Sequence, residues 1–237
     1  MSKWLSSRVM KKILIFWILF FIGVGYLAVS SSSDKTQPKN LSEKDYIEQT
    51  LKSLGWPAQT NAGSLFKPVE GELYLPIRNF YKNQKLNIFG TYNTGRFVGF
   101  HTGVDVEVEF EDITKDVPVY ASYTGTVELV EESSGYGGVV TIRHNFEDKT
   151  IAGIYGHLRF KDIKVRKGDR VTSGQLLGYL GANNSPETDG ERKHLHFGLY
   201  SGRTTDIRGY VSNESELKNN WINPTAFLHQ LGAKLVE

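Results

Sequence analysis

The chain has 237 residues, of which 39% are hydrophobic and 23% charged, and this composition suits one globular domain with appendages. Its net charge of +2 depends on four cations that precede the first acid, Asp34, so the remainder carries about −2 and offers no basic stripe to nucleic acid. Because there is no cysteine, disulfides, thiolate metal sites and a cysteine nucleophile are excluded, and any metal must be held by nitrogen and oxygen.

A hydrophobic run near the N-terminus predicts a membrane segment. Residues 13–29 contain no charge and follow Lys11 and Lys12, and about 17 to 25 apolar residues are enough to span a bilayer. We expect a cytoplasmic tail over residues 1–12 and a transmembrane anchor over 13–30, because cations stay on the cytoplasmic side. The small residues around Val29 leave a cleaved signal peptide open, although the run is longer than the apolar region of such a peptide.

A linker and a helix are predicted to follow the anchor. Residues 31–40 are polar and indicate a short linker, and residues 41–86 indicate a membrane-proximal helix with a loop-rich approach to the next domain. Ser42 is a suitable N-cap, apolar residues then recur at helical spacing, and Pro57 ends the run. The helix over residues 41–54 serves as a spacer or as a docking site for a protein regulator.

From Asn87 onward, short runs of β-branched and aromatic residues are separated by glycine-containing turns. The predicted strands are 117–121, 125–130, 138–143, 151–157, 171, 176–180 and 194–200. This spacing predicts an all-β domain over residues 87–232, built mainly as an antiparallel sheet or sandwich. Asn223 and Pro224 are an N-cap and a first-turn proline, so a short helix is expected to run through Leu231.

Two of the six histidines, His194 and His196, flank a single apolar residue in a predicted strand. Alternate residues of a strand share a face, so both imidazoles point one way while Leu195 and Phe197 point into the core. Such a pair can meet one metal ion and one substrate. The alternative is an amphipathic strand whose polar face happens to be histidine.

A second group of ligand-type residues is His101 and Asp105. From Val104 to Glu111 apolar and acidic residues alternate, which predicts a strand and allows Asp105 to be one of four solvated acids. In an extended chain, positions four apart lie about 13 Å from each other, too far for shared coordination, so the chain must turn at Thr102 and Gly103. His157, His144 and His229 are each isolated in the sequence, and as lone residues they have weaker claims to a site.

Together these residues resemble the signature of the lysostaphin-type, or LytM-type, zinc metallopeptidases, which cut the peptide cross-links of bacterial peptidoglycan. That signature is a histidine, three residues and an aspartate, followed much later by a histidine-x-histidine pair. The chain has both, as His101 to Asp105 and His194 to His196, and has similar connecting segments such as Tyr155-Gly156-His157-Leu158. The resemblance covers about residues 87–227.

The resemblance implies one zinc ion per domain, held by His101, Asp105 and His196. It also implies that His194 is the general base for the zinc-activated water, and that His157 orients this water and stabilises the charged intermediate. Two imidazoles and one carboxylate leave the fourth zinc position open, and histidine titrates near neutral pH. The implied substrates are the stem and cross-link peptides of peptidoglycan. With the anchor, the implied location is the bacterial cytoplasmic (inner) membrane, single-pass, with the catalytic domain on the extracytoplasmic or periplasmic side.

The resemblance leaves a second function open, because some LytM-like modules have lost ligands and instead activate other cell-wall hydrolases. All five polar positions are present here, which favours catalysis. The chain departs from the family pattern in two long polar segments, 182–193 and 201–220, that flank the strand with the histidine pair. We expect both segments to wall the substrate groove.

Overall fold

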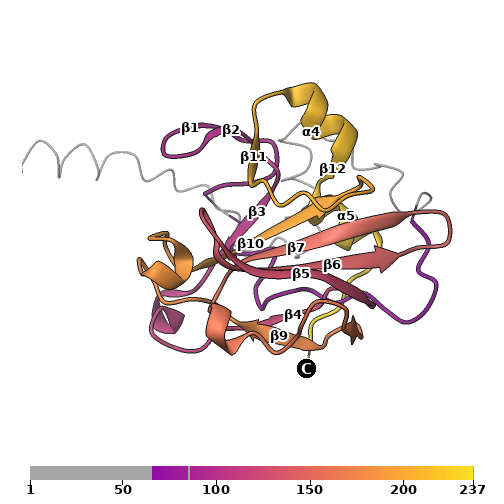
Figure 1. The fold of residues 1–237 in the computed structure, drawn as a ribbon, viewed down its shortest axis with the longest axis horizontal. Coiled ribbons are helices and arrows are strands. Elements are labelled where there is room, and N and C mark those ends of the chain that lie inside the picture. The colour runs from indigo at the N-terminus through magenta and orange to yellow at the C-terminus, as the bar shows by residue number, and fades with distance from the viewer. Residues whose placement is uncertain (1–65, 85, 237) are drawn as a thin grey trace, which may run out of the picture. The chain divides into compact units, whose positions relative to one another are not determined.

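The computed structural model describes residues 66–84 and 86–236 (Figure 1). The predicted anchor over 13–30 and the predicted helix over 41–54 lie outside these residues. Among the residues described, no helix has the length and apolar character needed to cross a membrane.

A seven-stranded antiparallel sheet crosses the middle of the domain in Figure 1. Its path is β12-β10-β7-β6-β5-β8, and β3 pairs with β10. The strands are β3 (Gly103–Glu107), β5 (Gly125–Ser133), β6 (Gly137–Asn145), β7 (Thr150–Leu158), β8 (Arg170–Val171), β10 (His194–Tyr200) and β12 (Trp221–Ile222). The prediction of a mainly antiparallel β-domain is therefore confirmed.

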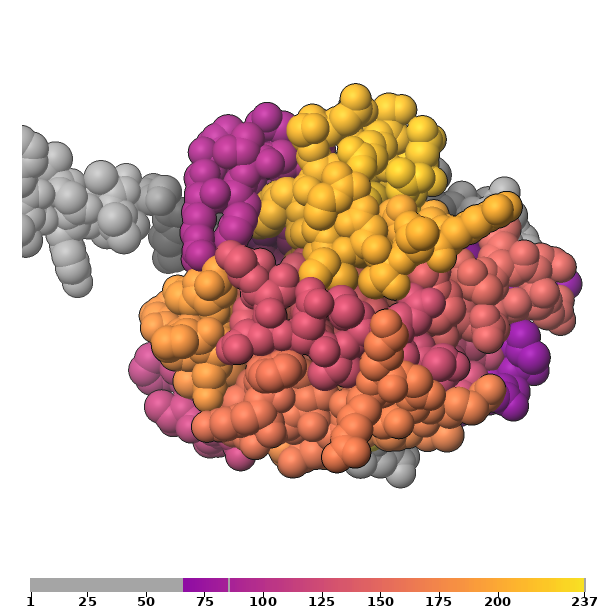
Figure 2. Space-filling view, in the orientation of Figure 1, coloured from indigo at the N-terminus to yellow at the C-terminus, as the bar shows by residue number. Residues whose placement is uncertain are grey.

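Two smaller sheets accompany the main one. In one, a hairpin of β1 (Tyr92–Thr94) and β2 (Val98–His101) pairs with β11 (Tyr210–Val211). In the other, β4 (Pro118–Tyr120) pairs with β9 (Leu176–Tyr179). Strand β11 pairs with β2 in this sheet, and Figure 2 shows the magenta part of the chain lying against the yellow-orange C-terminal part at the surface.

The helices in the described residues are short. They are α4 (Glu214–Asn220), α5 (Pro224–Gln230) and the 3-10 turns η1 (Phe110–Asp112), η2 (Phe160–Asp162) and η3 (Pro186–Thr188). Helix α5 confirms the predicted C-terminal helix, and the Asn223 side chain accepts hydrogen bonds from the backbone N–H groups of Thr225 and Ala226 as its N-cap. Helix α4 was not predicted, although Asn213 caps it in the same way.

The prediction of one long alternating strand through Glu111 is wrong beyond Glu107. Strand β3 ends there because its partner β10 begins at His194, which is the residue paired with Glu107. The chain then turns into η1, and Phe110 is 88% exposed instead of lying on a buried face. Asp105 in turn is buried and is not one of a row of solvated acids.

The core extends across the sheet and includes residues ahead of the predicted domain. Leu195 and Phe197 of β10 are fully buried, as the alternating pattern predicts. Leu73, Ile77 and Phe80 are buried in the same cluster. Strand β10 lies between β3 and β7, and in this register His196 pairs with Asp105 on one side and with Gly156 on the other. The fold thus brings three distant parts of the sequence to one point.

Candidate metal centre

A bend between β2 and β3 brings His101 and Asp105 together. His101 is the last residue of β2, Thr102 lies at the bend, and Gly103 begins β3. A Cβ atom at Gly103 would lie 2.5 Å from the Phe197 carbonyl oxygen, so only glycine allows this approach to β10. The turn predicted at Thr102 and Gly103 is confirmed, and His101 Nε2 lies 3.2 Å from Asp105 Oδ1.

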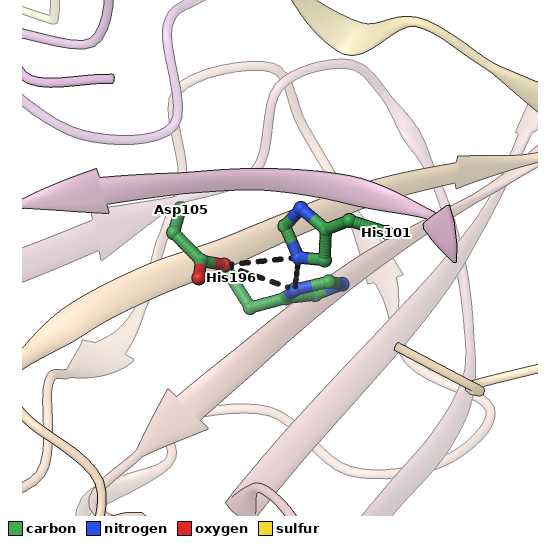
Figure 3. A group of neighbouring side chains, drawn as sticks. All are labelled: His101, Asp105 and His196. Atoms are coloured by element: carbon green, nitrogen blue, oxygen red, sulfur yellow. Dashed lines mark hydrogen bonds and ion pairs between the residues drawn. The ribbon is translucent and has the colours of Figure 1, made fainter. Parts of the chain in front are cut away.

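His101, Asp105 and His196 point toward one another from β2, β3 and β10 (Figure 3). His196 Nδ1 lies 3.0 Å from His101 Nε2 and 3.2 Å from Asp105 Oδ1. All three side chains are buried, and their ligand atoms lie within 4.8 Å of one another. Two imidazole nitrogens and one carboxylate oxygen are a donor set that suits zinc and leaves one tetrahedral position open. The residues therefore fit the metal that the resemblance implies.

Two further side chains hold Asp105 in place. Its Oδ2 atom accepts hydrogen bonds from Asn87 Nδ2 at 2.9 Å and from Arg192 Nη2 at 3.0 Å. Arg192 also donates to Glu107 through Nε, at 2.9 and 3.0 Å. These bonds leave Oδ1 facing the two histidines. Second partners of this kind orient metal ligands, and neither Asn87 nor Arg192 was predicted.

His194 and His157 lie beside the three ligands, with ring centroids 4.2 Å apart. His194 Nδ1 is 2.8 Å from the Arg192 carbonyl oxygen, so Nδ1 carries the proton and donates it there. Nε2 then holds the free lone pair and lies 3.5 Å from Asp105 Oδ2. His194 is therefore held in the tautomer that a base facing the ligands requires.

His157 has an unusual backbone for a residue with a side chain. It lies near the end of β7 with φ 63°, in the left-handed region that costs about 1 kcal/mol or more for most residues. Burial of its ring holds the pKa of His157 well below its usual range. Strain of this kind persists where the surroundings fix a side chain for a purpose.

A groove of about 470 Å³ opens onto these residues. Asp105, His157, His194 and His196 line it, together with Arg96 to Val98, Ser133 to Tyr136, Glu191, Arg192 and Ile207 to Tyr210. Both long polar segments contribute, as predicted. The described residues ahead of Arg96, including the approach segment, do not line it.

Asp189 joins three segments at the rim of this groove. Its Oδ2 atom accepts hydrogen bonds from Arg96 Nη2 at 2.6 Å and from the Gly135 backbone N–H at 2.7 Å. Arg96 also donates to Glu191 Oε1 at 2.9 Å. The segment of residues 182–193 is thereby tied to the β1–β2 turn and to the β5–β6 turn.

The two remaining histidines that the sequence singles out lie outside the groove. His144, on β6, packs with Tyr123 and approaches Tyr155. His229, in α5, packs against Tyr81. The structure therefore brings together the five residues of the predicted site and separates them from these two.

Comparison with known proteins gives a family and several relatives. Residues 99–207 match peptidase family M23. The chain is 30% identical over 134 residues to stage II sporulation protein Q of Bacillus subtilis, covering 54% of this chain and 43% of that protein. It is 32% identical over 101 residues to endolysin 2638A of Staphylococcus phage 2638A, covering 43% and 19%. The chain therefore spans less than half of the length of either relative.

A solved structure is also similar. The catalytic domain of lysostaphin from Staphylococcus simulans shares 25% identity, covering 61% of this chain and all of that one, with a TM-score of 0.44.

Proposed function

Residues 99–207 belong to peptidase family M23, of the lysostaphin and LytM type, and from this premise we propose that the chain is a zinc-dependent endopeptidase that cuts the peptide cross-links of bacterial peptidoglycan. The observation that supports the proposal most directly is the groove itself. Two of the three convergent ligand residues, Asp105 and His196, line it beside two further histidines, and His101 lies buried behind them. One of the further histidines, His194, is held with a free lone pair. Peptide hydrolysis by a metal and a base needs this set.

In the proposed reaction His101, Asp105 and His196 hold the metal. When bound, the metal supplies a Lewis acid that polarises the amide carbonyl and makes water more acidic. His194 Nε2 takes a proton from the attacking water as the water oxygen bonds to the carbonyl carbon. The carbon–nitrogen bond then breaks, and the same proton passes to the leaving amine. His157, beside His194, stabilises the negative charge on the former carbonyl oxygen.

The second candidate is a regulatory module that binds or activates other cell-wall hydrolases without cutting. One observation favours it: a relative at 30% identity is named as a sporulation protein and not as an enzyme. Retention of all five side chains, four lining one groove and His101 buried beside Asp105 and His196, favours catalysis.

Two variants of neighbouring residues separate these functions. His196→Ala should abolish zinc retention and hydrolysis, whereas His194→Ala should keep most of the zinc and lose hydrolysis. The measurements are zinc content and release of muropeptides from peptidoglycan of known cross-link type, with mass analysis of the products. Normal cutting by His194→Ala would contradict the assigned base. Zinc binding by the wild-type chain without any release would favour the regulatory module.

We further propose that residues 13–30 anchor the chain in the bacterial cytoplasmic membrane with the peptidase domain on the outer side. The uncharged run and the cations ahead of it support this orientation. The helix predicted over residues 41–54 would then offer a site for a protein regulator near the membrane. Protease treatment of intact spheroplasts should degrade the domain, and full protection would contradict the orientation.

A further inference from the structure

Tyr136 carries a polar atom that the fold does not use. Its side chain is buried, and its hydroxyl has no hydrogen-bond partner among the described residues. Leaving a buried hydroxyl without a partner costs about 1 to 3 kcal/mol. A phenylalanine would fill the same space without that cost, so packing alone does not explain a tyrosine here.

The hydroxyl belongs to a small group of such atoms at the candidate metal centre. Seven buried side-chain atoms lack a partner among the described residues, and three of them are Tyr136 Oη, His157 Nδ1 and His196 Nε2. The Tyr136 ring centroid lies 5.5 Å from that of His157 and 5.2 Å from that of His196. All three residues line the groove. Three of the seven unpaired atoms are therefore neighbours at the groove, where a polar ligand would bind.

Two glycines shape the space around the Tyr136 ring. A Cβ atom at Gly156 of β7 would lie 2.3 Å from Tyr136 Cδ1, so no side chain is possible there without moving the ring. A Cβ atom at Gly209 would lie 3.1 Å from the hydroxyl oxygen. The hydroxyl is thus covered on that side only by backbone. The chain makes room for a tyrosine at this position from two separate segments.

We propose that Tyr136 is a catalytic residue whose hydroxyl donates a hydrogen bond to the carbonyl oxygen of the scissile amide. The inference rests on the proposed endopeptidase function. A neutral donor aimed at this oxygen stabilises the negative charge that develops as water attacks. A tyrosine hydroxyl keeps its proton at neutral pH, so it is available as a donor. The bond forms in the bound peptide and strengthens in the transition state.

A second buried tyrosine supplies a matched control. Tyr155 of β7 accepts a hydrogen bond from the Ser122 backbone N–H at 2.9 Å and does not line the groove. Removing the Tyr155 hydroxyl breaks a bond within the fold, whereas removing the Tyr136 hydroxyl breaks none. The two Tyr→Phe changes should therefore have opposite consequences.

The experiment uses the full chain as wild type, Tyr136→Phe and Tyr155→Phe. With a cross-linked muropeptide as substrate, Tyr136→Phe should lower kcat about 100-fold and raise KM about fivefold. Its zinc content should be unchanged, and the Tm of its metal-free form should be equal or higher. Tyr155→Phe should keep kcat and lower Tm.

Two results would overturn the inference: wild-type kcat in Tyr136→Phe, or a loss of kcat that is accompanied by a lower Tm or by loss of zinc. If the wild-type chain cuts nothing, the proposed function has failed, and Tyr136 is tested by binding of the intact muropeptide to metal-free protein. Binding about fivefold weaker in Tyr136→Phe would then support the contact with the peptide carbonyl. Equal binding of the muropeptide to the wild type and to Tyr136→Phe would contradict this contact.

Discussion

The domain contains two buried pairs of histidine and tyrosine, and they differ in whether their polar atoms are used. In the first pair, His144 Nδ1 lies 3.0 Å from the Thr124 carbonyl oxygen, and Nε2 lies 3.5 Å from the Tyr155 hydroxyl. In the second pair, Tyr136 Oη and His196 Nε2 have no partner among the described residues. All four side chains are buried. Burial therefore does not distinguish the two pairs. They differ in whether their polar atoms have hydrogen-bond partners within the described part of the protein.

The difference indicates which cluster stabilises the fold and which one retains polar atoms that a ligand could use. A buried polar group with partners inside the protein adds to stability, and one without partners subtracts from it. Strand β7 contacts both clusters through a glycine, since Cβ atoms at Gly153 and Gly156 would lie 2.8 Å from His144 Nε2 and 2.3 Å from Tyr136 Cδ1. A glycine of β7 thus makes room for the His144 ring in one cluster and for the Tyr136 ring in the other.

The largest expected difference between the two clusters comes from matched substitutions at His157 and His144. Asparagine tolerates the left-handed backbone of His157, so His157→Asn should leave the unfolding free energy nearly unchanged while kcat/KM falls by about 10² to 10⁴. His144→Asn should keep kcat/KM and lose about 2 kcal/mol of stability. Hydrolysis rates and urea unfolding measure both quantities. Equal loss of activity in the two variants would break the comparison.

A smaller effect is expected at low pH, where the burial of His144 should lower the free energy of unfolding. Burial lowers the pKa of His144 to about 4 in the folded protein, against 6.5 for a free side chain. Between these values the unfolded chain binds more protons, so stability rises with pH. The contribution is complete above about pH 6.5, and about 3 kcal/mol is lost as the pH falls toward 4.

Urea unfolding of the metal-free wild type and of His144→Asn at a series of pH values measures this contribution. The unfolding free energy should depend more steeply on pH in the wild type. An identical pH dependence in the two proteins would mean that His144 is protonated in the folded state. Its two ring nitrogens would then not be paired with Thr124 and Tyr155 as described.

The smallest expected difference between the two clusters comes from two arginine–glutamate pairs. Arg143 donates to Glu128 at 3.0 and 2.9 Å beside the structural cluster, and Arg192 donates to Glu107 and Asp105 beside the metal ligands. Arg192→Gln should weaken zinc binding about tenfold, because it removes a partner of Asp105 Oδ2. Arg143→Gln should leave zinc affinity unchanged and lower the unfolding free energy by about 1 kcal/mol. Competition with a zinc chelator and urea unfolding measure the two effects.

The parts of the fold that follow from local pattern could be predicted. Strand β10 was predicted over residues 194–200, as found, because its alternation is complete, and Asn223 and Pro224 marked the start of α5. The histidine and aspartate positions came from spacing and family resemblance. The turn at Thr102 followed from the reach of an extended chain.

What could not be predicted depends on contacts between distant residues. Strand β3 ends where β10 stops pairing with it, which its own alternating sequence does not reveal. Arg192 reaches Asp105 across 87 positions. Pattern alone treats His144 and His157 alike, as lone histidines in strands. The family resemblance singled out His157, and only the neighbours of the two residues in space show why they differ. Tyr136 was visible as part of a glycine-flanked turn, but its unused hydroxyl was not.

The junction at Asp189 bears on attempts to retarget the domain. One carboxylate oxygen holds the turn at Arg96 and the turn at Gly135 against the segment of residues 182–193. Replacing the segment of residues 182–193 would leave the other two turns without their shared acceptor, whereas replacing the turn at Arg96 would remove only one of the two donors. We therefore expect an exchange of residues 182–193 to be tolerated best when both turns are exchanged with it, so this segment is the part of the rim on which the others depend.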